Sequence, residues 1–130
     1  MHQQNVERVA HRLGRAFVEA ELPPPVHAVM MINDPTHWES NFQICTDLLV
    51  SKDGVPGSVR RADDPQFTKL FISNPDFLYS DSFALPRFAQ GPFLDCLELL
   101  FKKQYGFGFE VEKQGKPERV TFDFAEGLLQ

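Results

Sequence analysis

Apolar residues occur in short blocks along this chain, and the spacing within each block predicts its local structure. Over residues 5–21 they lie three or four positions apart, which is the pattern of a helix with one apolar face. Three prolines at positions 23–25 end that helix, because proline has no backbone N–H to donate. Residues 26–32 are instead a nearly continuous apolar run, and a second run covers residues 68–73. Both runs stop at turns rich in Asn, Asp and Pro, which indicates buried strands.

Two further helices are predicted between and after these strands. Thr36 and Glu39 have the spacing of a capping box and predict the start of the first, which ends near Ser51. The second begins at about Pro92 and ends before Gly106. The residues expected on the apolar faces are Trp38, Phe42, Cys45, Leu48 and Leu49 in the first helix and Phe93, Leu97, Leu100 and Phe101 in the second.

The remaining segments complete an alternating pattern. Residues 51–64 and 77–90 are expected to be irregular, residues 107–111 a third short strand, and the segment from Pro117 to the end a last helix. Alternation of helices and strands predicts an α/β fold with a mostly parallel sheet, flanking helices and a three-layer type of architecture. The expected division is residues 1–25, an N-terminal helix and proline turn, residues 26–114, an α/β domain, and residues 115–130.

Composition narrows the function classes. The chain has 130 residues, enough for one domain, and thirteen Lys and Arg against eighteen Asp and Glu give a net charge of −5. No basic run interrupts this acidity, which argues against nucleic-acid and membrane-surface partners. No apolar stretch is long enough to span a membrane, and the N-terminus does not resemble a secretion signal.

Cysteine and histidine positions support no metal site. Cys45 and Cys96 lie far apart in apolar helical patterns, and we expect two buried free thiols in a reducing compartment, the cytoplasm or the mitochondrion. The four histidines share no metal-ligand spacing.

Candidate binding residues follow the second strand. In a parallel sheet, ligands bind where the strands end, and Asn74 and Asp76 lie at such an end. Both residues also suit a turn in which they bind only their own backbone, as do Asn33 and Asp34.

Two further segments combine a cation with a turn. Arg87 precedes Gly91, at which a helix opens, and helix N-termini offer free N–H groups to anions. Lys116 lies between a glycine and a proline, so that a fixed loop holds its charge, as a phosphoryl-transfer site requires. The alternatives are a loop contact for Arg87 and a solvated turn for Lys116.

Taken in order, these segments resemble the class IIA branch of the haloacid dehalogenase (HAD)-like hydrolases, in particular the cat eye syndrome critical region protein five-like group. The resemblance runs from Val26 to Gln130. The segments that carry it are Ile32-Asn33-Asp34-Pro35 with Trp38, Phe71-Ile72-Ser73-Asn74-Pro75-Asp76, Leu85-Pro86-Arg87-Phe88 with Gln90-Gly91, and Gly115-Lys116-Pro117.

The resemblance implies that residues 26–114 are a cap domain and that residues 115–130 begin the returning catalytic core. Lys116 matches the catalytic Lys of the third family motif, and Asn74, Asp76, Arg87 and Gly91 are the candidate substrate-binding residues of the cap. Neither the Asp nucleophile motif nor the acidic motif that completes the Mg²⁺ site is found in this sequence. Ala89 stands where the family usually has glycine.

Two functions remain open on this basis. The first is the substrate-recognition cap of a phosphatase for phosphorylated small molecules, inactive by itself. The second is a non-enzymatic protein-interaction module derived from such a cap. In either case the apolar residues after Pro117 need a surface to cover, which predicts self-association or docking on a catalytic domain.

Overall fold

The computed structural model describes residues 24–114 and 126–128 and contains the predicted parallel sheet. Strands β1 (Ala28–Met31), β2 (Lys69–Ile72) and β5 (Val111–Lys113) lie in the order β1-β2-β5, and both neighbouring pairs are parallel. The pairing of Ala28 with Lys69 and of Leu70 with Val111 sets the register. The prediction of an α/β fold with a mostly parallel sheet is confirmed.

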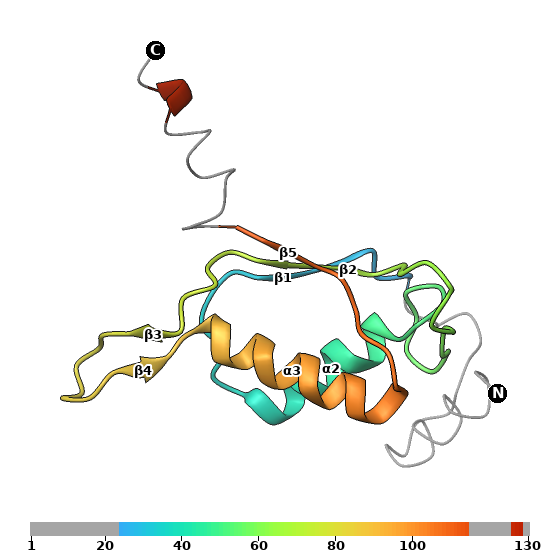
Figure 1. The fold of residues 1–130 in the computed structure, drawn as a ribbon, viewed down its shortest axis with the longest axis horizontal. Helices are drawn as coiled ribbons and strands as arrows, with labels where there is room; N and C mark the ends of the chain where they lie inside the picture. Colours follow the sequence, from blue (N-terminus) through green and yellow to red (C-terminus); the bar gives the residue numbers. More distant parts are fainter. Residues whose placement is uncertain (1–23, 115–125, 129–130) are drawn as a thin grey trace.

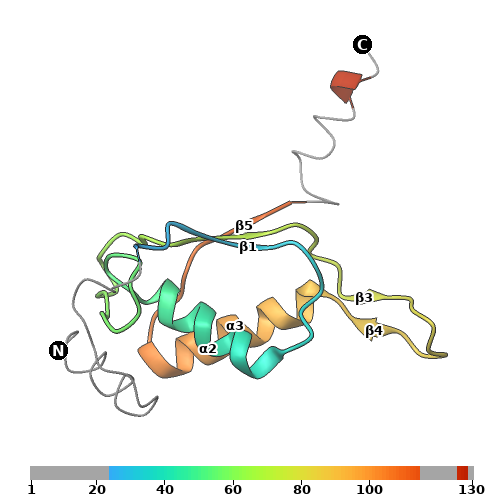
Figure 2. The same ribbon diagram turned by 180° about the vertical axis from the view of Figure 1, so that it is seen from behind.

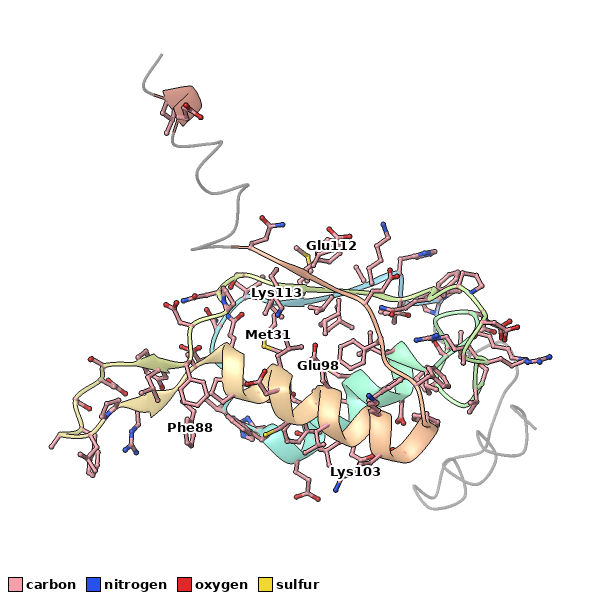
Figure 3. All side chains as sticks on the ribbon, in the orientation of Figure 1. Met31, Phe88, Glu98, Lys103, Glu112 and Lys113 are labelled. Carbon is pink, nitrogen blue, oxygen red and sulfur yellow. The ribbon has the colours of Figure 1, made fainter. Side chains whose placement is uncertain are left out.

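Both described long helices cover the same face of this sheet. Helices α2 (Trp38–Leu49) and α3 (Gln90–Tyr105) lie side by side beneath it, and the view from behind shows the same arrangement (Figures 1 and 2). The described residues therefore form two layers, a sheet and a pair of helices. Figure 3 shows Met31 directed toward the helices and Glu112 directed away from them.

The core lies between the two layers. Its fully buried apolar side chains come from β2, from α3 and from Leu49 at the end of α2. Phe93 stacks on Phe42 of α2 with ring centroids 4.5 Å apart. Trp38 also meets Phe93 edge to face. Trp38 and Phe42 are half-buried and pack against the core from α2. The buried apolar cluster consists of Cys45, Leu49, Val50, Leu70, Ile72, Phe93, Leu94, Leu97 and Phe101.

Two predictions for α3 are wrong. Cys96 is exposed rather than buried, and Leu100 is 46% exposed although it was expected on the apolar face. The residues facing the sheet are Phe93, Leu94, Leu97 and Phe101. Cys96 and Leu100 lie on one flank of that stripe, because each residue turns the helix by about 100°, and no described element covers this flank. Cys45 is buried as predicted.

The predicted capping box at α2 is also wrong. The N-cap residue is His37, and no side chain caps the helix. The Thr36 hydroxyl lies 3.1 Å from the His37 Nδ1 instead. The helix start is fixed by Trp38, whose indole N–H donates to the Pro35 carbonyl at 2.8 Å.

The third strand begins later than the sequence pattern suggests, at Val111 instead of Phe107. The Gln66 side chain explains the shift, because it accepts from the Glu110 N–H at 2.7 Å and donates to the Glu110 carbonyl at 3.0 Å. A side chain therefore occupies the ladder position that β2 would fill. Phe107 and Phe109 nevertheless pack edge to face on Phe101.

The segment expected to be irregular contains a short antiparallel hairpin. Strands β3 (Leu78–Tyr79) and β4 (Arg87–Phe88) pair with each other and project from the end of the two-layer body (Figure 1). Strands of two residues are too short for an alternation pattern to predict. The Ala89 N–H donates to the Phe77 carbonyl and closes the hairpin base.

Within the described residues, no helix is long and apolar enough to cross a membrane. The predicted helix over residues 5–21, Lys116 and most of the predicted last helix lie outside the part of the chain that the structure describes. Within that last segment, residues 126–128 are described and are helical.

Candidate functional site

The carboxyl end of β2 meets the start of α3 through the buried side chain of Gln90. Its amide nitrogen donates to the Ser73 hydroxyl at 3.0 Å, and its oxygen accepts from the Asn74 N–H at 3.2 Å. The Ser73 hydroxyl donates in turn to the Ile32 carbonyl at 2.9 Å, at the end of β1. Gln90 is 2% exposed, so this chain of hydrogen bonds fixes both strand ends against the helix.

Gly91 allows the following turn to lie directly on the helix. Its N–H donates to the Asp76 carbonyl at 2.9 Å. A Cβ atom at this position would come within 2.7 Å of the Pro75 carbonyl oxygen and 2.8 Å of that of Asp76. Both contacts are with backbone, which cannot move aside cheaply, so the approach requires glycine.

Three of the predicted site residues are thus brought together at this edge of the sheet. Asn74 and Asp76 form one turn, in which the Asn74 side-chain oxygen accepts from the Asp76 N–H at 3.1 Å. This hydrogen bond to the backbone of the turn is one of the two roles that the sequence left open for Asn74, the other being contact with a ligand. Gly91 contacts the same turn from α3. The Asn74 and Asp76 side chains remain exposed and accessible to a ligand.

Arg87 is held elsewhere by the contacts that the structure contains. Its Nε donates to the carbonyls of Leu85 and Pro86, and its guanidinium lies 4.5 Å from the centre of the Phe83 ring. All of these partners belong to the hairpin. These are loop contacts of the kind that the sequence left open as the alternative role of Arg87. Lys116 lies outside the described residues.

The start of α3 offers fewer anion-binding donors than an ordinary helix. The Gly91 N–H is already bonded to the Asp76 carbonyl, and Pro92 has no N–H. The Phe93 N–H donates within the helix to the Ala89 carbonyl four residues earlier, so among the first residues of the helix only Gln90 keeps an N–H group for another partner. The anion site that the sequence suggested at Gly91 is correspondingly weakened.

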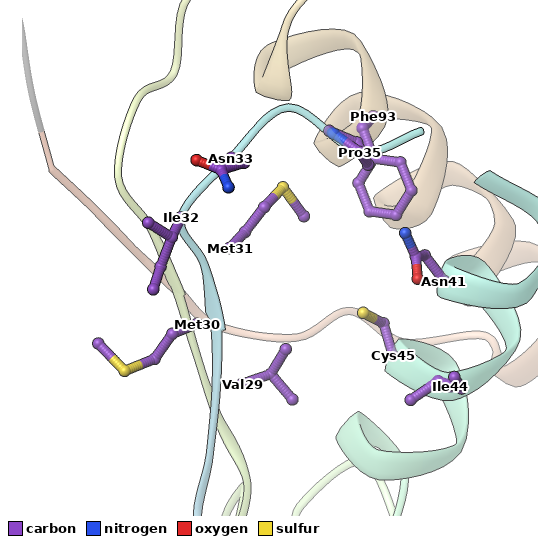
Figure 4. Close-up of a pocket in the computed structure, with 10 residues that line it drawn as sticks. All are labelled: Val29, Met30, Met31, Ile32, Asn33, Pro35, Asn41, Ile44, Cys45 and Phe93. Atoms are coloured by element: carbon purple, nitrogen blue, oxygen red, sulfur yellow. The ribbon is translucent and has the colours of Figure 1, made fainter. Parts of the chain in front are cut away.

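A groove opens beside β1, next to this edge. It has a volume of about 370 Å³ and lies between β1 and α2 (Figure 4). Met31 lines it from the strand, Cys45 and Ile44 from α2, and Asn33 and Asn41 supply polar groups. Burial raises the pKa of the Cys45 thiol, so the thiol in this groove stays protonated and unreactive near neutral pH.

Sequence reasoning missed the polar residues that organise the fold. Arg60 is 4% exposed, donates from Nε to the Leu49 carbonyl at 3.0 Å and from Nη2 to the Gly108 carbonyl at 3.2 Å, and lies over the Phe107 ring. Burial lowers the pKa of this guanidinium, while the charges of Asp64 and Glu110 act in the opposite direction. Nothing in the sequence around Arg60, which lies in a polar loop, or around Gln90 indicates that these side chains are buried.

The described residues contain no group of three or more His, Cys, Asp or Glu side chains that could hold a metal ion. The carboxylates at the carboxyl edge of the sheet, such as Asp76, are exposed and single.

No family model matches the chain, but curated proteins do, among them two from yeasts. It is 33% identical over 105 residues, 81% of its length, to a protein of Schizosaccharomyces pombe named cardiolipin synthase (CMP-forming)/mitochondrial hydrolase fusion protein. It is 32% identical over 104 residues, 78% of its length, to a mitochondrial hydrolase of Saccharomyces cerevisiae. The chain spans only 18% and 29% of the lengths of these relatives.

The names of these two relatives both contain the words mitochondrial hydrolase. The chain is therefore similar to one region of hydrolase proteins that are several times longer.

Proposed function

We propose that this chain is the cap, or substrate-recognition, portion of a HAD-like phosphatase and does not hydrolyse phosphate esters by itself. The observation that carries the proposal is the junction of β1, β2 and α3, which presents the Asn74–Asp76 turn at the carboxyl edge of a parallel sheet. The similarity to part of two longer hydrolases points to the same class of function.

In this proposal the exposed side chains of Asn74 and Asp76 contact the substrate, with the turn held rigid by Gln90 and Gly91. A turn fixed by buried hydrogen bonds places its side chains accurately, which favours selective binding. Arg87 supplies a cation for a phosphorylated small molecule. To do so, its guanidinium has to leave the Phe83 ring, which it covers here.

Lys116 is proposed as the catalytic cation, by its resemblance to the Lys of the third HAD motif. A lysine stabilises negative charge on a phosphoryl group but does not itself break the P–O bond. HAD-type transfer also requires a carboxylate nucleophile and Mg²⁺. The described residues do not fit a Mg²⁺ site, since they hold no cluster of three ligands, and we assign no Mg²⁺ ligand to them.

The test compares this chain with a chimera. In the chimera, the matching region of the Saccharomyces cerevisiae mitochondrial hydrolase is replaced by residues 24–130 of this chain. With para-nitrophenyl phosphate and Mg²⁺, the chain alone is expected to release no nitrophenol above buffer, and the chimera is expected to release it. Lys116→Ala in the chimera should reduce the rate by a factor of at least about 10².

Two outcomes would contradict the proposal. One is phosphatase activity of the purified chain alone that Lys116→Ala abolishes. The other is a folded chimera that binds Mg²⁺ but releases no nitrophenol.

A second candidate function is a non-enzymatic interaction module built on the same fold. The hairpin favours it, because six of its large apolar residues are between 37% and 63% exposed. They are Phe77, Leu78, Tyr79, Phe83, Leu85 and Phe88. Under this function the chimera is inactive, and replacing Phe83 and Leu85 by Ser abolishes partner binding without changing the unfolding midpoint.

We also propose a mitochondrial location, because both relatives are named as mitochondrial. Fractionation of cells that express the tagged natural protein tests this, with the cytoplasm as the contrary outcome.

A further inference from the structure

The two edges of the three-stranded sheet differ in how they are protected. Strand β5 carries Glu112 and Lys113, and charges of this kind keep an edge from pairing with another strand. Strand β1 (Ala28–Met31) has no charged residue and no proline, and its pairing with β2 is regular over all four residues. By the usual criteria for sheet edges, β1 is unprotected.

Hydrogen bonds to β2 show which backbone groups of β1 point outward. The Lys69 N–H donates to the His27 carbonyl at 2.9 Å, and the Ser73 N–H donates to the Met31 carbonyl at 3.0 Å. In a parallel ladder, alternate residues of one strand face the other, so Ala28 and Met30 direct their N–H and C=O groups away from β2. Among residues 24–114 and 126–128, no strand lies on that side of β1.

The side chains around this edge are apolar and exposed as well. Met30 and Ile32 of the outer sheet face are 66% and 68% exposed, and Ile44 of α2 is 56% exposed. Figure 4 shows Ile44 and Met31 on opposite sides of the groove that runs along the edge. The edge and its surroundings therefore combine unpaired backbone groups with uncovered apolar surface, which together fit an added strand.

We propose that β1 pairs with β1 of a second copy of this chain, antiparallel about a two-fold axis at Val29. In that register, Ala28 lies opposite Met30 of the other copy, and the two pairs exchange four backbone hydrogen bonds. The product is a continuous six-stranded sheet with all the α2 and α3 helices on one face. The α2 helices of the two copies then flank the axis, and Ile44 of each copy covers the groove.

A second copy is favoured over another partner by the chemistry of the edge. A two-fold interface brings the same surface together with itself, so it requires a patch without repulsion between like charges. The residues from His27 to Asn33 carry no formal charge in a chain whose net charge is −5. A basic partner, which would suit the rest of this acidic chain, finds no carboxylate along this edge.

The first test is a cross-link at the axis. Val29 would face Val29 of the other copy in a non-hydrogen-bonded pair, with Cα atoms about 4.5 Å apart, within the range of a disulfide. We expect Val29→Cys, in a Cys45→Ala and Cys96→Ser background, to give mainly a disulfide-linked dimer under mild oxidation. The matched control is Glu112→Cys on the β5 edge in the same background, which is expected to form no disulfide-linked dimer.

The second test removes one backbone donor. Met30→Pro deletes an N–H that points away from β2, and prolines are tolerated on edge strands. By sedimentation, the unmodified chain should have twice the monomer mass of 14.9 kDa, and Met30→Pro should be a monomer with the same circular dichroism spectrum. Met30→Leu keeps the N–H and should remain a dimer. If Met30→Pro does not fold, Met30→Lys, which changes only an exposed side chain, replaces it.

Any of three results would overturn the proposal: an unmodified chain that is monomeric at micromolar concentration, a folded Met30→Pro or Met30→Lys variant that is still dimeric, or equal cross-linking of the Val29→Cys and Glu112→Cys variants. None of these measurements depends on phosphatase activity.

Discussion

The core beneath the sheet and the projecting hairpin use the same kinds of residue in opposite ways. Phe93 and Phe101 are fully buried between the helices and the sheet, whereas Phe83 and Phe88 of the hairpin are more than half exposed. The core aromatics touch several other rings. At the hairpin, Phe83 contacts only the guanidinium of Arg87 among the aromatic and cation contacts of the described residues.

The difference shows that apolar composition alone does not decide what stabilises this fold. Burial of a phenyl ring stabilises the folded state because the surface of the ring is removed from water, whereas an exposed ring stabilises it hardly at all. The hairpin aromatics are therefore available for another function, such as contact with a catalytic domain or a partner protein. Mutations in the two regions should separate cleanly in their effects on stability.

Phe93→Ala should have the largest effect. Its ring stacks on Phe42 and meets Trp38 edge to face, so truncation removes buried surface and leaves a cavity. We expect the free energy of unfolding in urea to fall by about 3–5 kcal/mol. Phe83→Ala is the matched control in the hairpin and should change it by less than about 0.5 kcal/mol. Equal losses for the two variants would mean that the hairpin is packed in solution.

Arg60→Ala tests whether the same contrast holds for cations. Arg60 is buried and donates to two carbonyls of distant segments. The side chain of its neighbour Arg61 instead forms an exposed ion pair with Asp63 at 3.6 Å. We expect a loss of about 2–3 kcal/mol for Arg60→Ala, since charged hydrogen bonds are broken and carbonyls are left unpaired. Arg61→Ala should cost less than about 0.5 kcal/mol. Thermal unfolding of both variants measures these losses of stability, and a greater loss for Arg61→Ala than for Arg60→Ala would contradict the structure.

Gly91→Ala tests the contact that joins the candidate site to the core. The added Cβ would press on the Pro75 and Asp76 carbonyls, and such overpacking costs about 1–3 kcal/mol. Gly108→Ala is the control, because nothing lies within 4 Å of a Cβ there and its φ is not positive. Chemical denaturation provides the measurement. A neutral Gly91→Ala would mean that the turn can move off α3 without cost.

Asp47→Asn should give the smallest effect and the opposite sign. Partial burial raises the pKa of the Asp47 carboxyl, so the folded state holds its proton more tightly than the unfolded state, and the ionised carboxylate weakens folding above the ordinary carboxyl pKa. Near neutral pH, Asp47→Asn should therefore stabilise the fold by at most about 0.5 kcal/mol after solvent screening. This gain should vanish as the pH falls below the carboxyl range. A gain that persists in acid would exclude titration of Asp47 as its cause.

Much of the architecture follows from local sequence patterns. The apolar runs ending at Asn33 and Asn74 predicted β1 and β2 as parallel neighbours, because strands separated by a helix return in the same direction. The helical spacing of Phe93, Leu97 and Phe101 placed the buried face of α3 correctly. The close sequence proximity of Asn74 to Asp76 likewise predicted one exposed turn.

The errors arose where a distant partner determines the local structure. The third strand starts at Val111 because Gln66, 44 positions before Glu110, bonds to the backbone of Glu110. Helix α2 starts at Trp38, whose side chain bonds to Pro35, although Thr36 has the better capping sequence. Cys96 is exposed because no described element packs on its side of α3.

The sequence by itself determined the order, type and direction of the main elements, since periodicity and turn residues act over a few neighbouring positions. Only the tertiary structure decided which polar groups are buried, such as Arg60 and Gln90, and which apolar residues are left uncovered, on the hairpin and along β1. The physical reason is that burial depends on what packs against a side chain, and the segments that pack here lie as far apart in the chain as Trp38 and Phe93.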